Sequence, residues 1–246
     1  MGIIGGANNN VLQPVTQVNV NGLAIDGLIL YYDAARPYSY PKTGAVWHDL
    51  SGTGTAADGF KTGSIVNGTT FSTAGGGSLI FDGTDDQVKI DQGTNTTNPI
   101  LLGAGWTATF WVKTTTNGGL FSHWSGGPVN LALAITSGKM NFYYYDGQWN
   151  DGPATTGTTV TTGQWVALTW VRPVSNTDPV LMYVNNVLDF SLSPRISWGS
   201  YQMGNIGAWW SFNYFNGSIG NVMVHSKVLT ATERTQNYNI LRQRFY

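Results

Sequence analysis

Carboxylates and nucleophile motifs are the features of this sequence that could carry catalysis. A retaining glycosidase needs two carboxyl groups about 5–5.5 Å apart, and the 246-residue chain contains a single glutamate, Glu233. Asp85 and Asp86 are adjacent, but neighbouring side chains in a turn point in different directions, and aspartates that close a turn are the simpler interpretation. The chain has no Gly-x-Ser-x-Gly motif and no cysteine. We therefore expect no catalytic residues and a protein that is not an enzyme.

Metal sites have equally sparse support. The three histidines, His48, His123 and His225, fall in separate segments without the spacing of metal ligands. Hard oxygen ligands at predicted strand ends could hold a structural calcium ion, which takes six to eight oxygens, but no EF-hand spacing is present. The alternative is that these residues merely close turns. The candidate calcium ligands are Asp33, Asp49, Asp82, Asp85 and Asn221.

Clustered aromatic residues provide the strongest binding signal. Strand alternation over residues 139–145 places Tyr143 and Tyr145 on the face opposite Phe142, and a glycine-containing loop then follows. Rings beside amide and carboxylate groups suit a sugar, which stacks one face and hydrogen-bonds its hydroxyls. Core packing or a subunit interface would use the same residue types. The candidate ligand-binding residues, including a second cluster near residue 210, are Tyr143, Tyr145, Trp149, Asn150, Asp151, Trp209 and Trp210.

The composition favours one large all-β domain. The chain has 32 glycines and only 10% charged residues, which is typical of many tight turns that join short strands. Its 10 Trp, 12 Tyr and 10 Phe supply ample apolar surface for one core. A net charge of −1 argues against nucleic acid as a partner. The N-terminal residues have no basic region and no long apolar run, so we expect neither a secretory signal nor a membrane span.

The alternation of apolar and polar residues predicts the positions of the strands. The segment 78–90 is predicted to form a β-hairpin, with turn residues from Asp82 to Asp86. Asn185 and Asn186 tolerate positive φ and predict a two-residue hairpin turn. Further strands are predicted over residues 28–33, 64–66, 70–71, 105–114, 120–123, 129–136, 139–145, 164–171, 180–184, 187–192, 203–207 and 217–226.

Two end segments differ from the rest. Thr230 and Glu233 form a capping-box pattern that predicts a helix to Leu241, packed at the edge of the sandwich with residues 242–246 as a tail. Residues 1–27 are expected to form an N-terminal arm outside a domain of residues 28–246. The arm could be a disordered leader or a segment that adds a strand to a neighbouring subunit.

Five segments in order resemble a known family. These are WHDLSG, IVNGTTFSTAGGGSLIFDGTDDQVKI, WTATFWVK, QWVALTWV with LMYVNN, and FNGSIGNVMVHSKVLTATERTQNYNILRQRF. Together they resemble a laminin G-like, concanavalin A-like lectin/glucanase domain over residues 28–245, and the last segment resembles versions found in tailed-phage virion proteins. The chain departs from the family pattern at Asn186, where Gly is usual, and at His225-Ser226, where Tyr-Asn is usual.

The resemblance implies an all-β, concanavalin A-like jelly-roll β-sandwich with one short C-terminal helix. The family binds glycans or proteins, often with a structural calcium ion, and its glucanases carry paired Glu residues that this chain lacks. We therefore expect a non-enzymatic virion structural protein, a capsid decoration or a fibre or tail surface module, that binds host glycan or neighbouring virion subunits in an oligomeric assembly. The alternatives are a glycan-processing enzyme that uses Asp residues and a secreted, extracellular bacterial carbohydrate-binding adhesion module.

Overall fold

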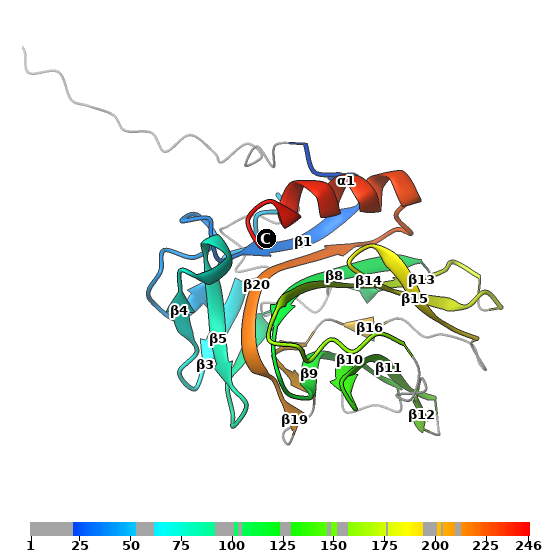
Figure 1. The fold of residues 1–246 in the computed structure, drawn as a ribbon, viewed down its shortest axis with the longest axis horizontal. Helices are drawn as coiled ribbons and strands as arrows, with labels where there is room; N and C mark the ends of the chain where they lie inside the picture. The colour runs from blue at the N-terminus through cyan, green and yellow to red at the C-terminus, as the bar shows by residue number, and fades with distance from the viewer. Residues whose placement is uncertain are drawn as a thin grey trace, which may run out of the picture.

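Two antiparallel sheets face each other across one core (Figure 1). The structure, a computed structural model, describes residues 22–52, 62–91, 101–102, 105–123, 129–146, 149–151, 157–175, 177–193, 201–202, 204–209 and 213–246. Within these ranges the all-β sandwich with one C-terminal helix is confirmed. None of the helical segments in these ranges is long and apolar enough to cross a lipid bilayer.

The first sheet, called here the helix-side sheet, has its strands in the order β15, β14, β13, β8, β20, β5 and β4, and β1 also pairs with β20. Its strands are β1 (Leu28–Asp33), β4 (Thr70–Ser72), β5 (Ser78–Asp82), β8 (Trp106–Lys113), β13 (Trp165–Arg172), β14 (Val180–Val184), β15 (Val187–Leu192) and β20 (Asn216–His225). Asn185 and Asn186 have φ of 50° and 66°, which confirms the predicted turn between β14 and β15.

The second sheet, called here the opposite sheet, has the order β12, β11, β10, β9, β17, β6, β3 and β2. Its strands are β2 (Val46–Trp47), β3 (Thr62–Val66), β6 (Gln87–Asp91), β9 (Gly118–His123), β10 (Val129–Thr136), β11 (Lys139–Asp146), β12 (Trp149–Asp151) and β17 (Asn205–Ile206). Two short ladders complete the described strands: β7 (Leu101–Leu102) with β16 (Tyr201–Gln202), and β18 (Ala208–Trp209) with β19 (Asn213–Tyr214).

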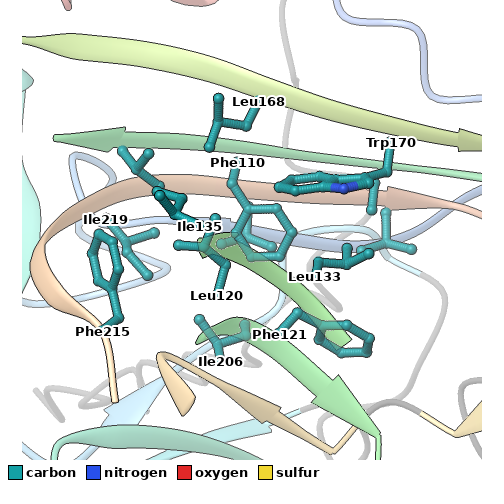
Figure 2. Packing of buried hydrophobic residues seen from close by; sticks show 14 of the residues in the cluster. Phe110, Leu120, Phe121, Leu133, Ile135, Leu168, Trp170, Ile206, Phe215 and Ile219 are labelled. Atoms are coloured by element: carbon teal, nitrogen blue, oxygen red, sulfur yellow. The ribbon is translucent and has the colours of Figure 1, made fainter. Parts of the chain in front are cut away.

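The core lies between the sheets. Phe110, Leu168 and Trp170 of the helix-side sheet point toward Leu120, Leu133 and Ile135 of the opposite sheet (Figure 2). All six side chains are fully buried. This interlocking follows from strand alternation, which turns Leu133 and Ile135 of β10, and Leu168 and Trp170 of β13, to the same inner face.

The predicted hairpin over residues 78–90 is wrong. β5 pairs with β4 and β20 in the helix-side sheet, whereas β6 pairs with β3 and β17 in the opposite sheet. The chain therefore crosses from one sheet to the other through residues 83–86. Leu79, Phe81 and Val88 still enter the same core, because alternation determines which face of a strand is buried and not which strand pairs with it.

The helix covers the outer face of the helix-side sheet and not its edge. α1 (Ala231–Arg242) begins at Thr230, whose side chain accepts a hydrogen bond from the Glu233 backbone N–H, so the predicted capping box is confirmed. Leu241 and Tyr238 pack against Trp111 and its neighbours in a second apolar cluster. In Figure 1 the helix lies above β1 and β20.

The chain after the helix, predicted as a tail, is docked against the helix-side sheet. Phe245 stacks on Trp111 with ring centroids 4.4 Å apart, and an Arg244 guanidinium N–H donates to the buried Asp33 carboxylate. A Cβ at Gly75 or Gly220 would lie 2.8 or 2.7 Å from the Phe245 ring, so both positions require glycine for this close approach.

The proposed arm falls largely outside the described residues, which begin at residue 22. Residues 22–27 lie against the helix: Leu23 is buried in the second cluster, and the Ala24 N–H donates to Asn237 Oδ1 at 2.7 Å. The domain boundary at residue 28 stays a prediction.

Candidate functional site

The predicted faces of β11 are confirmed where the structure describes the side chains. Met140, Phe142 and Tyr144 are buried in the core between the sheets, while Asn141 and Tyr143 lie on the outer face of the opposite sheet. This outer face is the one on which the sequence analysis placed the candidate ligand-binding tyrosines.

Residues 149–151 form an edge strand, β12, instead of the predicted loop. Their register with β11 sets Trp149 opposite Tyr145, and Asp151 opposite Tyr143. Directly opposed residues share a face of a sheet, so Trp149 and Asp151 occupy outer-face positions. Asn150 is opposite Tyr144, a core residue, and therefore falls on the other face. At Tyr145 and residues 149–151 the structure describes the backbone alone.

Tyr143 and Trp209, which are 66 positions apart in sequence, form one stacked pair. Their ring centroids are 4.1 Å apart and the ring planes meet at 25°. Trp209 belongs to β18, which crosses the outer face over β9. A Cβ at Gly119 would lie 2.2 Å from the Trp209 nitrogen, so glycine there lets the two backbones meet. Ala132 and Ala134 provide small side chains beneath the pair.

Tyr143 is held rigidly. Its hydroxyl donates to Thr136 Oγ1 at 2.9 Å and accepts from Asn141 Nδ2 at 3.0 Å. The side chain is 9% exposed, whereas Trp209 is half-buried. Tyr143 thus supports Trp209 from below, and Trp209 is the member of the pair that reaches solvent. Trp210, the remaining predicted residue, lies outside the described residues.

The five calcium candidates separate into three places. Asp33 and Asn221 are opposed in β1 and β20, where Asp33 forms salt bridges with Arg36 and Arg244. Asp49 accepts a hydrogen bond from the Tyr31 backbone N–H at 2.7 Å. Asp82 and Asp85 lie together in the bend between β5 and β6, beside Asp86, which was not among the predicted calcium ligands.

The only glutamate is a structural residue. Glu233 Oε1 accepts from Lys227 Nζ at 2.9 Å, and Oε2 accepts from the Thr230 backbone N–H at 2.8 Å. The hydrogen bond from Lys227, followed by the one from the Thr230 backbone, lowers the pKa of Glu233 to about 2. A carboxylate so fixed at a helix start is poorly suited to proton transfer.

We expect Glu233→Ala to lower the free energy of unfolding by about 1 kcal/mol near neutral pH, because the helix loses its capping box. The folded pKa of Glu233 lies below its ordinary value of 4.5, so its contribution is present above that pH and is lost as pH falls through about 2. Urea unfolding of both proteins across this range should show the difference shrink toward acid. A pH-independent difference would contradict this account, and Glu233→Gln should give a smaller loss.

A small cavity of about 20 Å³ lies between α1 and the helix-side sheet. Thr109, Trp111, Arg234 and Asn237 are among its lining residues. It has room for about one water molecule, while small-molecule pockets measure roughly 300–1,000 Å³. This cavity is therefore too small to hold a sugar.

Residues 82–233 match the family model of the concanavalin A-like lectin/glucanases superfamily. A comparison with curated proteins finds no match. Among solved structures, domain 4 of AbnA, a GH43 extracellular arabinanase from Geobacillus stearothermophilus in complex with arabinotriose, is 18% identical. Its TM-score is 0.62, and the alignment covers 87% of this chain and 97% of that one.

Two botulinum neurotoxin domains are similar as well. The receptor binding domain of the C/D mosaic serotype is 12% identical with a TM-score of 0.62, and 88% of this chain and 52% of that chain are covered. The serotype D ligand binding domain in complex with N-acetylneuraminic acid is 13% identical with a TM-score of 0.60, and the covered shares are 87% and 51%. The chain spans about half the length of each of these two domains.

Proposed function

The chain belongs to the concanavalin A-like lectin/glucanases superfamily, and from that premise we propose that it is a non-catalytic module that binds carbohydrate on the outer face of the opposite sheet. The observation that carries the proposal is the convergence of two distant aromatic segments, β11–β12 and β18, on that face. We call the positions Tyr143, Tyr145, Trp149 and Trp209 the aromatic ledge.

The ledge has the chemistry that a sugar requires. An indole held at a fixed angle offers an apolar plane to the C–H face of a sugar ring, and little conformational entropy is lost because the ring is already ordered. Asp151 shares the outer face with the ledge by its register with Tyr143, and a carboxylate there accepts hydrogen bonds from sugar hydroxyls. The rigid support of Trp209 by Tyr143 favours binding without rearrangement.

Two of the similar structures contain carbohydrate, arabinotriose in one and N-acetylneuraminic acid in the other. Because identity is below 20% in both cases, they support carbohydrate as the ligand class and leave the particular sugar to experiment. A glycan array that includes arabinan fragments and sialylated glycans tests the proposal. We expect specific, saturable binding to at least one glycan class, and uniform background over the array would refute it.

We also propose that the module does not hydrolyse glycans. The single glutamate is engaged in the helix cap, and the three clustered aspartates lie at a bend between strands. Incubation with laminarin or lichenan should release no reducing sugar above a heat-killed control. Release above that level would favour the alternative of an enzyme that uses Asp residues.

A further proposal concerns where the module acts. The extracellular arabinanase that carries the similar AbnA domain favours an extracellular adhesion or carbohydrate-binding module. The virion role, with contacts to neighbouring virion subunits, stays a prediction from the resemblance of the C-terminal segment.

A further inference from the structure

His225, the last residue of β20, is a buried histidine that takes no part in the proposed glycan site. Its side chain is 1% exposed, and its Nε2 lies 2.8 Å from the carbonyl oxygen of Ala24. A carbonyl oxygen can only accept a hydrogen bond, so Nε2 carries the hydrogen and donates it. One neutral imidazole thus joins β20 to the segment before β1, which is 201 positions away in the sequence.

That segment, residues 22–27, forms neither a strand nor a helix. Leu23 is buried in the cluster under the helix, and Ala24 is held through both of its backbone polar groups. The Ala24 N–H donates to Asn237 Oδ1 of α1 at 2.7 Å, and the Ala24 carbonyl accepts from His225. Because the segment has no ladder of backbone hydrogen bonds, its docking depends on side chains such as these.

Uncharged residues flank His225 within the helix-side sheet. The register places Leu28 of β1 opposite it on one side and Thr107 of β8 opposite it on the other. The charged groups that act on the ring come from the segment, from the turn after β20 and from the first turn of α1. They are Asp26, Lys227 and Glu233. Lys227 Nζ contacts both carboxylates, at 2.6 Å and 2.9 Å, so the group carries one net negative charge.

Burial is the main influence on the ring, and it lowers the pKa of His225 below the ordinary value of 6.5. The hydrogen bond to the Ala24 carbonyl and the two carboxylates oppose this shift, and the Lys227 ammonium adds to it. A histidine that is exposed when the segment is released therefore binds a proton more tightly than the docked one. Docking is fully stable above about pH 6.5 and weakens as the pH falls below that value. The pKa of Glu233 is about 2, so Glu233 stays charged in this range.

We propose that His225 is a pH-sensitive latch, which holds residues 22–27 on the domain when the ring is neutral and releases them when the ring is protonated. Release moves the point at which the chain leaves the domain from residue 22 to the start of β1. It requires no change between the sheets, because Val222 and Val224 of β20 face that core and His225 does not. The family pattern usually has Tyr at this position, and a tyrosine hydroxyl does not titrate between pH 5 and 8.

Backbone amide exchange in the full chain, followed by NMR at pH 7.5 and pH 5.5, tests the latch. Each rate is divided by the rate for an unprotected peptide at the same pH, which gives a protection factor. At pH 5.5 an exposed histidine is about ten parts protonated to one part neutral, so we expect the protection factor of the Ala24 amide to fall about three- to tenfold. The amide of Leu168, in the middle of β13, should change little. An unchanged factor for Ala24, or an equal fall for Leu168, would overturn the proposal.

His225→Gln assigns the effect to the ring, because glutamine keeps an N–H donor and does not titrate. Its Ala24 amide should have the same protection factor at both pH values. His48→Gln is the matched control, since His48 is exposed and lies outside the segment, and it should show the wild-type fall. A wild-type fall in His225→Gln, or none in His48→Gln, would refute the assignment.

The wild-type ring provides a second measurement, which decides the matter if His225→Gln does not fold. The Cε1–H resonance of His225 should titrate with a midpoint below 6.5, and the protection of the Ala24 amide should be lost over the same pH range. A midpoint at or above 6.5, or titration of the ring without loss of protection at Ala24, would contradict the latch.

Discussion

Trp170→Ala will lower the free energy of unfolding by about 3–5 kcal/mol, the range for removal of a buried aromatic side chain. Trp170 is fully buried in the centre of the core, where its ring meets Phe110 edge-on with centroids 6.0 Å apart. Its indole Nε1–H donates across the sandwich to the Asn141 carbonyl of β11 at 3.1 Å. The substitution therefore removes apolar contacts and also a hydrogen bond that links the two sheets.

Urea unfolding measures this loss of free energy, and the m-value should be the same for the variant and the wild type. Trp170→Phe should cost less than Trp170→Ala, because it retains a ring and loses the donor. Val174→Ala, at a side chain that is 66% exposed, is the control and should stay within about 0.5 kcal/mol of the wild type. A loss below about 1 kcal/mol for Trp170→Ala would mean that the two sheets do not pack as described.

Trp149→Ala will weaken glycan binding by a factor of about five to more than a hundred, equivalent to about 1–3 kcal/mol, the usual cost of removing an aromatic anchor. The register of β11 and β12 sets Trp149 opposite Tyr145 on the outer face, next to the Tyr143 and Asp151 pair. Isothermal titration with the best glycan from the array measures the change in Kd.

Two controls accompany this variant. Tyr38→Ala removes an aromatic side chain that is 79% exposed in the connection between β1 and β2, and it should leave the Kd unchanged. Urea unfolding of Trp149→Ala should show little loss of stability. A loss of about 3 kcal/mol or more, typical of an emptied core site, would show that Trp149 belongs to the interior and that its assignment to the ledge is wrong.

The sequence was sufficient to predict the longer strands and their buried faces, because alternation is a local property. Met140, Phe142 and Tyr144 enter the core as predicted, and the capping box at Thr230 needed only two residues three positions apart. Strand partners are not local. The segment 78–90 has the same alternation whether it forms a hairpin or crosses between sheets, and its turn residues are compatible with both.

The site depends on contacts between distant segments, and its geometry therefore could not be predicted from the sequence. Both aromatic clusters were selected, yet the stacking of Tyr143 on Trp209 follows from the path of β18 over Gly119. The β12 strand was predicted as a loop because three residues beside glycines carry no periodicity. Asp86 was passed over as an ordinary turn residue, since its burial and its unpartnered oxygen arise only in three dimensions.

Indole N–H resonances measured during a glycan titration test the central claim, that the outer face of the opposite sheet binds carbohydrate. The chain has 10 tryptophans, and single Trp→Phe variants assign their signals. The account predicts saturable shifts for Trp149 and Trp209, while Trp111 and Trp165, which lie in the cluster under the helix, stay unchanged. Shifts confined to Trp111 and Trp165, or no shift with any glycan that binds on the array, would contradict it.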